Sequence, residues 1–458
     1  MTLKKKIGLG LGIALGLVAL CVLAAVVFLN TDASHRYILN VVIKEAQAAT
    51  GARVDIANLS FHRARLGADF SNVTIRSPES NSGSPLFFAD RVGIDIGLHL
   101  FHTPKIGVED VTVDHPVIHL LFDSRGNSNL PHANASPSGS STNIFDLAIG
   151  HFVLNRGEIF FNDTRVPIAA DIHDLNARAA YQDLKSSYDA ALSYRNGQVL
   201  YGDFAPFTHN LELALSAGTS GITLQSLVIH SGASSLQAQG TLTNYHAPSF
   251  EGSYQANLSM EELLSKLAKS ESASRQTIKG LIDTNGKLTY RYSPSMGAMD
   301  SISVAGTFRS RSVQLQSPDL LASVENLSGD YGLKNGVLES RKIDADTMGG
   351  HVTARLVISQ LADRAAGQLD AAVQGITIPA VRKALRAQEL PGIRMDGKIQ
   401  GNAQAKWHGS FMDLHVVSSA RLAGTVSSAS VENNRSGSFP LNGAAQVSYD
   451  GRREIVDV

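Results

Sequence analysis

The feature that most constrains the fold is an alternation of apolar and polar residues with a period of two. It is clearest in residues 92–100, where every second residue is aliphatic: Val92, Ile94, Ile96, Leu98 and Leu100. The residues between them are small or polar. Because side chains point alternately to the two faces of a strand, this segment is predicted to be a strand with one apolar and one wetted face, as in antiparallel sheets.

The same alternation recurs along the chain, in residues 66–75, 111–122 and 168–172. Turn-forming sequences accompany the runs: Asn155-Arg-Gly157, Asn196-Gly197, Asn285-Gly286 and Asn335-Gly336. Asn–Gly pairs favour tight hairpins because both residues accept positive φ. The prediction is a mainly β fold, an elongated antiparallel meander with short interrupting helices.

One interrupting helix is predicted near the N-terminus. In residues 35–50, Ile38, Val42 and Ala46 recur every fourth residue, which is the spacing of an amphipathic helix. Gly51 follows at the position where glycine commonly ends a helix.

A second helical segment, residues 260–275, belongs to an internal repeat. Residues 258–267 align without gaps on residues 376–385. Similar strand-like restarts follow the two segments, at Gly286-Lys-Leu288 and at Gly397-Lys-Ile399. The chain is therefore predicted to repeat every ~115 residues, with several strands and one short helix in each unit.

A membrane anchor precedes the first predicted helix. Three lysines end at Lys6, and an uncharged run then begins at Ile7 and ends at Leu29, long enough to cross a bilayer as a helix. The run exceeds the apolar part of a cleaved signal peptide. The lysines predict a single-pass membrane protein with a cytoplasmic N-terminus and its bulk exported across the membrane. Within the run Gly8, Gly12 and Gly16 share one face, which is either a helix-pairing face or the ordinary glycine content of such helices.

Composition excludes several classes of function. Lysine plus arginine (40) nearly balance aspartate plus glutamate (41), so there is no basic field to attract nucleic acid. The single cysteine, Cys21, allows no internal disulfide.

Residues for catalysis are also missing from the sequence. It contains no phosphate-binding loop, no G-x-S-x-G and no H-E-x-x-H motif. His115 and His119 would lie roughly 13 Å apart on a strand, too far for one metal ion. Asp95, Asp110 and Asp114 are interpreted as solvated carboxylates on a wet face. Trp407 is interpreted as a packing residue. We expect no enzymatic activity, no metal and no cofactor.

Composition also suggests the domain boundaries. The Ser-, Asn-, Gly- and Pro-rich residues 123–143 are predicted to be a flexible linker or loop. The predicted parts are residues 1–30 for the tip and anchor, 31–122 for the helix and first β unit, 123–143 for the linker, 144–275 and 276–390 for two β repeats, and 391–458 for the start of another. Because the chain ends inside a strand-like stretch, a fragment of a longer protein is expected.

Several segments in the first ~180 residues resemble the AsmA-like family of Gram-negative envelope proteins, whose larger members are TamB-type. After the lysine-flanked anchor these segments are Gly51-Ala-Arg-Val-Asp-Ile56, Phe70-Ser-Asn-Val-Thr-Ile75, Ala89-Asp-Arg-Val92, Ile106-Gly-Val-Glu-Asp-Val-Thr-Val113, Asp123-Ser-Arg-Gly-Asn-Ser-Asn-Leu130 and Asn155-Arg-Gly-Glu-Ile159 with Asn162-Asp163. Their order along the chain carries the resemblance.

The resemblance implies a half-open β-groove with an apolar concave face, similar to bridge-like lipid transfer proteins with a chorein-like N-terminus. It implies an inner-membrane anchor with the bulk of the chain in the periplasm. It also implies phospholipid transport toward the outer membrane, with Val92, Ile94, Ile96, Leu98 and Leu100 lining the groove. Two alternatives stay open. One is a scaffold that guides outer-membrane β-barrel proteins by strand addition; the other is an envelope enzyme whose active site lies beyond Val458. The sequence does not distinguish an open groove from closed sandwiches, since alternation only shows that one face is dry.

Overall fold

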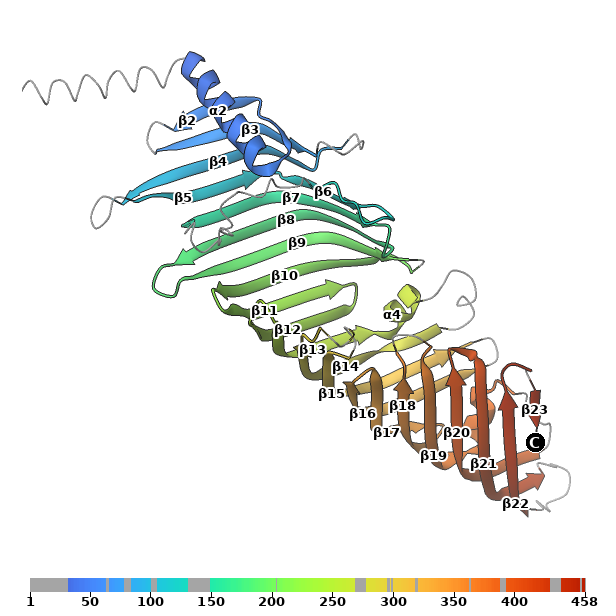
Figure 1. Ribbon diagram of the computed structural model, residues 1–458. Helices are drawn as coiled ribbons and strands as arrows, with labels where there is room; N and C mark the ends of the chain where they lie inside the picture. The colour runs from blue at the N-terminus through green and yellow to red at the C-terminus, as the bar shows by residue number, and fades with distance from the viewer. Residues whose placement is uncertain are drawn as a thin grey trace, which may run out of the picture. The chain divides into compact units, whose positions relative to one another are not determined.

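The computed structural model describes residues 32–62, 66–77, 84–99, 105–130, 149–202, 204–267, 277–294, 297, 300–317, 320–361, 364–387, 393–428, 438–453 and 455–457. The chain forms two compact units, Met1–Gly202 and Asp203–Val458. Both consist mainly of antiparallel strands with few helices (Figure 1), which confirms the mainly β prediction.

The predicted membrane anchor, with its ends Ile7 and Leu29 and its glycines Gly8, Gly12 and Gly16, lies outside these residues. Among the helices that the structure does describe, none combines the length and the apolar character needed to cross a bilayer.

The described part of the first unit contains one helix and nine strands. They are α2 (Asp32–Thr50), β1 (Arg53–Asp55), β2 (Asn58–His62), β3 (Gly67–Arg76), β4 (Phe87–His99), β5 (Lys105–Asp114), β6 (Val117–Phe122), β7 (His151–Asp163), β8 (Ile168–Gln182) and β9 (Ser187–Tyr201). The helix confirms the N-terminal prediction. It ends at Gly51, which has a φ of +68° and donates its backbone N–H to the Gln47 carbonyl at 2.9 Å.

The prediction that all strands pair antiparallel is wrong at β7, which pairs in parallel with both β5 and β6. Pro116 is fully buried between β5 and β6 and cannot donate to the sheet, so the strand breaks there. Parallel strands need a long crossover. The connection from 123 to 150 makes this crossover and contains the predicted linker, residues 123–143. Residues 131–148 of the connection lie outside the described ranges.

Within its described residues, the second unit has fourteen strands and two helices. They are β10 (Phe207–Gly218), β11 (Gly221–Ser231), β12 (Ser234–Thr243), β13 (Ser249–Ser259), α4 (Met260–Leu267), β14 (Thr277–Arg291), β15 (Ile302–Gln316), β16 (Leu321–Lys334), β17 (Val337–Thr347), β18 (Gly350–Ser359), β19 (Ala366–Thr377), α5 (Ile378–Ala384), β20 (Ile393–His408), β21 (Ser410–Ser428), β22 (Ser438–Asp450) and β23 (Ile455–Asp457). Each strand pairs antiparallel with the next.

The internal repeat is visible in this unit. Met260 and Ile378, the first residues of α4 and α5, occupy the same position of the two aligned segments. Each helix follows a long strand, β13 or β19, and precedes another, β14 or β20. The same local pattern therefore produced the same order of elements twice.

Only one of the four predicted hairpin turns is a turn. Asn335 and Gly336, both with positive φ, connect β16 and β17. The other three lie inside strands. Arg156 and Asn196 have positive φ where the pairing of β7 and β9 with β8 is irregular, because a β-bulge accepts the same residues as a turn. Gly286 lies in the middle of β14.

Few apolar side chains are fully buried. In the first unit, Ala52, Val54 and Leu59 form a small core close to α2. In the described part of the second unit, only Ala345 and Ala384 among apolar residues are buried. A closed sandwich would bury one face of every strand. The described strands instead leave their apolar faces partly exposed.

Candidate functional site

The apolar face of the first unit consists of two rows of side chains that lie side by side on neighbouring strands. One row contains Phe70, Val92, Val113, Leu154, Ala177 and Leu192. The other contains Ala68, Ile94, Val111, Phe152, Ala179 and Ala190. All except the buried Val113 are half-exposed. The rows run across the strands, so they form a surface that is continuous from β3 to β9.

The structure places the five predicted lining residues unevenly. Val92 and Ile94 lie within the two rows. A β-bulge between Asp95 and Ile96 shifts the register, and Ile96 is 40% exposed. Leu98 is paired with Ile106. Leu100 lies outside the described residues.

The second unit has a matching apolar face. Its rows include Leu356, Leu369, Ala405, Val416 and Tyr449; Ala354, Ala371, Ala403, Ser418 and Val447; and Val352, Val373, Gly401, Ala420 and Ala445. On β20 the apolar-face residues from Met395 to Trp407 are half-exposed, while the polar residues between them are exposed. The period-two alternation thus continues through the whole strand.

Aromatic rings on this face lie over glycines. A Cβ on Gly367 would lie 2.0 Å from Cζ2 of Trp407, and one on Gly329 would lie 2.5 Å from Cζ of Phe308. A Cβ on Gly240 or on Gly252 would likewise lie 2.5 Å or 2.7 Å from an atom of the Phe250 ring. Glycine leaves room for each ring to lie along the sheet. The interpretation of Trp407 as a packing residue agrees with this contact.

Helices cover only parts of the apolar faces. In the first unit, the His35 ring of α2 lies 5.2 Å from the ring of Phe61 on β2. In the second, Ile378 of α5 lies 3.0 Å from the place of a Cβ on Gly397, and Ala384 is buried. The rows in the middle of the described strands are left open.

The opposite face of the first unit carries a network that the sequence did not predict. His62 contacts Asp69 through Nε2 at 2.8 Å and Asp95 through Nδ1 at 3.0 Å. Arg91 then donates to Asp69 at 3.3 Å and to Asp114 at 2.7 Å. The prediction that Asp95 and Asp114 are merely solvated is therefore wrong, because both carboxylates are paired across strands.

Three further residues considered in the sequence, Asp110, His115 and His119, also have partners. Nδ1 of His151 lies 3.1 Å from Asp110. Nδ1 of His115 lies 3.1 Å from Asp90, and Nδ1 of His119 lies 3.1 Å from the Pro85 carbonyl while its ring stacks on Phe160. Within the described ranges, no group of three or more His, Cys, Asp or Glu side chains is arranged to hold a metal ion.

The His62 network predicts a pH dependence of stability. The hydrogen bonds to Asp69 and then Asp95 raise the pKa of His62 above its ordinary value of 6.5. A raised folded-state pKa means that the stabilisation is complete below the unfolded pKa and is lost as pH rises through the folded pKa. His62→Gln should therefore lower the unfolding midpoint more at about pH 5.5 than at about pH 9. A loss of equal size at both pH values would show that the charge of His62 does not contribute.

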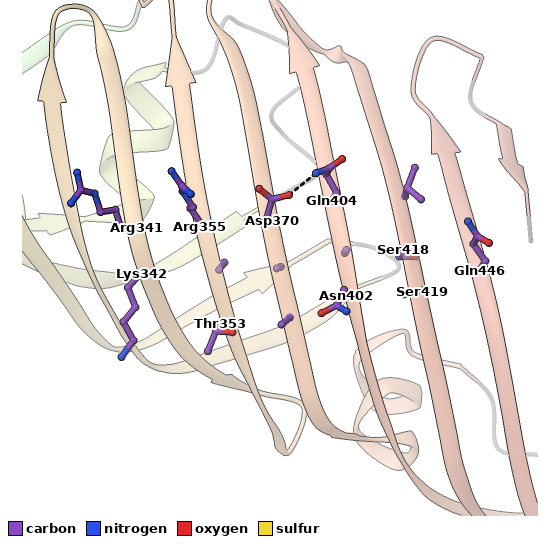
Figure 2. A pocket seen from close by; sticks show the side chains of 15 residues that line it. Arg341, Lys342, Thr353, Arg355, Asp370, Asn402, Gln404, Ser418, Ser419 and Gln446 are labelled. Carbon is purple, nitrogen blue, oxygen red and sulfur yellow. Dashed lines mark hydrogen bonds between the residues drawn. The ribbon is translucent and has the colours of Figure 1, made fainter.

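The polar face of the second unit has an open depression that differs in chemistry from the apolar rows. Figure 2 shows Arg341, Arg355, Asp370 and Gln404 lining it. Gln404 donates to Asp370 at 2.7 Å, and this bond, with one from Gln368, lowers the pKa of the Asp370 carboxyl. The depression is an exposed hydrogen-bonded surface rather than a site enclosed for chemistry.

No family model, curated protein or solved structure matches the chain. Each unit has an apolar face whose rows of side chains are mostly half-exposed in the described residues. A contiguous exposed apolar surface is typical of a binding surface.

Proposed function

We propose that the protein is a non-enzymatic lipid conduit of the AsmA-like type. In this proposal, residues 7–29 hold it in the inner membrane, and the apolar faces bind the acyl chains of phospholipids on their way through the periplasm to the outer membrane. The observation that carries the proposal is the set of apolar rows, continuous across neighbouring strands and covered only in part by the described helices.

The energetics favour acyl chains as the covering. Burying about 16 methylenes gains on the order of 10 kcal/mol, at about 0.8 kcal/mol each. Half-exposed rows such as those through Val92 and Ile94 offer such a chain a surface without breaking any hydrogen bond of the sheet. Along each row, the neighbouring strands present similar apolar side chains to an acyl chain. A lipid therefore meets the same kind of surface as it moves from strand to strand, while its headgroup stays in water. No covalent step is needed.

Site-specific photo-crosslinking in cells that express the full-length protein tests this proposal. A photoreactive residue is placed at Ile94 or at Val111 on the apolar face, and at Thr112 on the opposite face as the control. Phospholipid adducts are expected at the first two positions and not at Thr112. Crosslinks only within the chain would mean that the face is closed by protein, and adducts with outer-membrane β-barrel proteins would favour the scaffold alternative.

A further inference from the structure

A cluster of three hydroxyl groups lies on the apolar face of the second unit. Tyr254 on β13, Gly286 on β14, Gly306 on β15 and Tyr331 on β16 are register partners and form one row. A Cβ on Gly286 would lie 2.7 Å from the Tyr254 hydroxyl, and one on Gly306 would lie 2.7 Å from the Tyr331 hydroxyl. The two rings therefore extend over the glycines from opposite sides, and their hydroxyls form a hydrogen bond.

A third hydroxyl fixes the direction of the hydrogen bonds. Thr284 Oγ1 lies 3.0 Å from the Thr307 carbonyl, which can only accept, so the Thr284 proton is used there. Tyr331 lies 2.6 Å from Thr284 Oγ1 and must then donate to it. Since Tyr331 has only one proton, it accepts from Tyr254. The relay runs from Tyr254 through Tyr331 and Thr284 to the backbone.

The end of this relay is an acceptor. Tyr254 has used its only proton, so its oxygen can offer only lone pairs. Burial, followed by the hydrogen bond with Tyr331, raises the pKa of Tyr254, so the phenol keeps its proton at neutral pH. Gly286 lies near the middle of the fifteen-residue strand β14, so the acceptor is placed among apolar side chains and away from the strand ends.

We infer that Tyr254, Tyr331 and Thr284 form a polar subsite that accepts a hydrogen bond from a bound amphiphile carrying a hydroxyl group along its chain. This inference rests on the proposed lipid binding and adds a selectivity to it. A plain acyl chain leaves the Tyr254 lone pairs without a donor, whereas a chain hydroxyl supplies one. A chain ketone, which only accepts, gains nothing.

Binding of three matched fatty acids to the delipidated full-length protein tests the subsite. Stearic acid, a mid-chain hydroxystearic acid and the ketostearic acid of the same position compete with a fluorescent fatty acid. The hydroxy acid is expected to bind about fivefold more tightly than the other two, the effect of one net hydrogen bond. Tyr254→Phe keeps the ring and should abolish this preference. Tyr292→Phe, in the exposed turn after β14, is the matched control and should retain it.

The outcomes separate the two proposals. Equal binding of all three acids to the wild-type protein would overturn the subsite and leave the lipid conduit standing. A preference that persists in Tyr254→Phe would also overturn it. If none of the acids binds, both proposals fail. Preference in the wild type and in Tyr292→Phe, with none in Tyr254→Phe, supports the subsite, because a purely structural clasp between β13 and β16 would not distinguish a hydroxyl from a ketone.

Discussion

Replacement of Ala403 by glutamate is expected to reduce lipid binding by the second unit at least about tenfold. Ala403 lies in the middle of β20, between Ala371 and Ser418 of the neighbouring strands. A carboxylate there would have to lose its water when an acyl chain covers the face. Burying a charge without a partner costs several kcal/mol, and each 1.4 kcal/mol changes affinity about tenfold. The measurement is the binding of a fluorescent phospholipid to the purified full-length protein.

The control for this variant is the adjacent residue. Asn402 is exposed on the polar face of the same strand. Asn402→Glu therefore adds the same charge on the opposite face of the sheet and should leave lipid binding close to wild type. If the two variants bind lipid equally well, the face of the sheet does not matter, and the proposal that the apolar face binds lipid is contradicted. Thermal unfolding of both variants checks that each still folds.

The second large effect is expected from Gly367→Val. A Cβ at this position would lie 2.0 Å and 2.1 Å from atoms of the Trp407 ring, so the indole must leave its place over the glycine. Overpacking of this kind typically costs about 1–3 kcal/mol. Trp407 is the only tryptophan, and its fluorescence emission should shift to longer wavelength in the native protein as the ring becomes more exposed.

Gly443→Val is the matched control for Gly367→Val. No atom of the described structure lies within 4 Å of a Cβ at Gly443 on β22. This variant should keep the wild-type emission and the wild-type denaturation midpoint. Wild-type emission from Gly367→Val would instead show that the contact between the ring and the glycine is not maintained in solution.

The strand faces could be predicted from the sequence because they depend only on a local period. The alternation predicts that Val92 and Ile94 share a face, and both lie in the apolar rows of the first unit. The repeated helices α4 and α5 and the helix end at Gly51 also follow from short segments. In each case the information lies within about ten neighbouring residues.

Features that depend on cross-strand pairing could not be predicted. The sequence Asn285-Gly286 is typical of a turn, but Gly286 lies in β14, where the Tyr254 ring of the neighbouring strand occupies the space of a side chain. The network of His62, Asp69 and Asp95 joins residues far apart in sequence, and no local pattern indicates which carboxylates face one histidine. The parallel pairing of β7 likewise depends on where a long connection returns.

Whether an apolar face is open or closed is also a tertiary property. The sequence shows only that one side of each strand is dry. In the described structure Ala179 and Ala403 are half-exposed, whereas the core residue Leu59 beside α2 is 2% exposed. This difference in side-chain exposure distinguishes an open apolar face from a covered one. The proposed function is based on it.

Photo-crosslinking from paired neighbours in both units tests the central claim most directly. In the first unit the pair is Ala179 on the apolar face and Arg178 on the polar face; in the second it is Ala403 and Asn402. With the full-length protein in its cells, mass spectrometry should find phospholipid adducts at Ala179 and Ala403 and none at their neighbours. Lipid adducts at all four positions, or at none of them, would contradict the proposal that the apolar faces carry lipid.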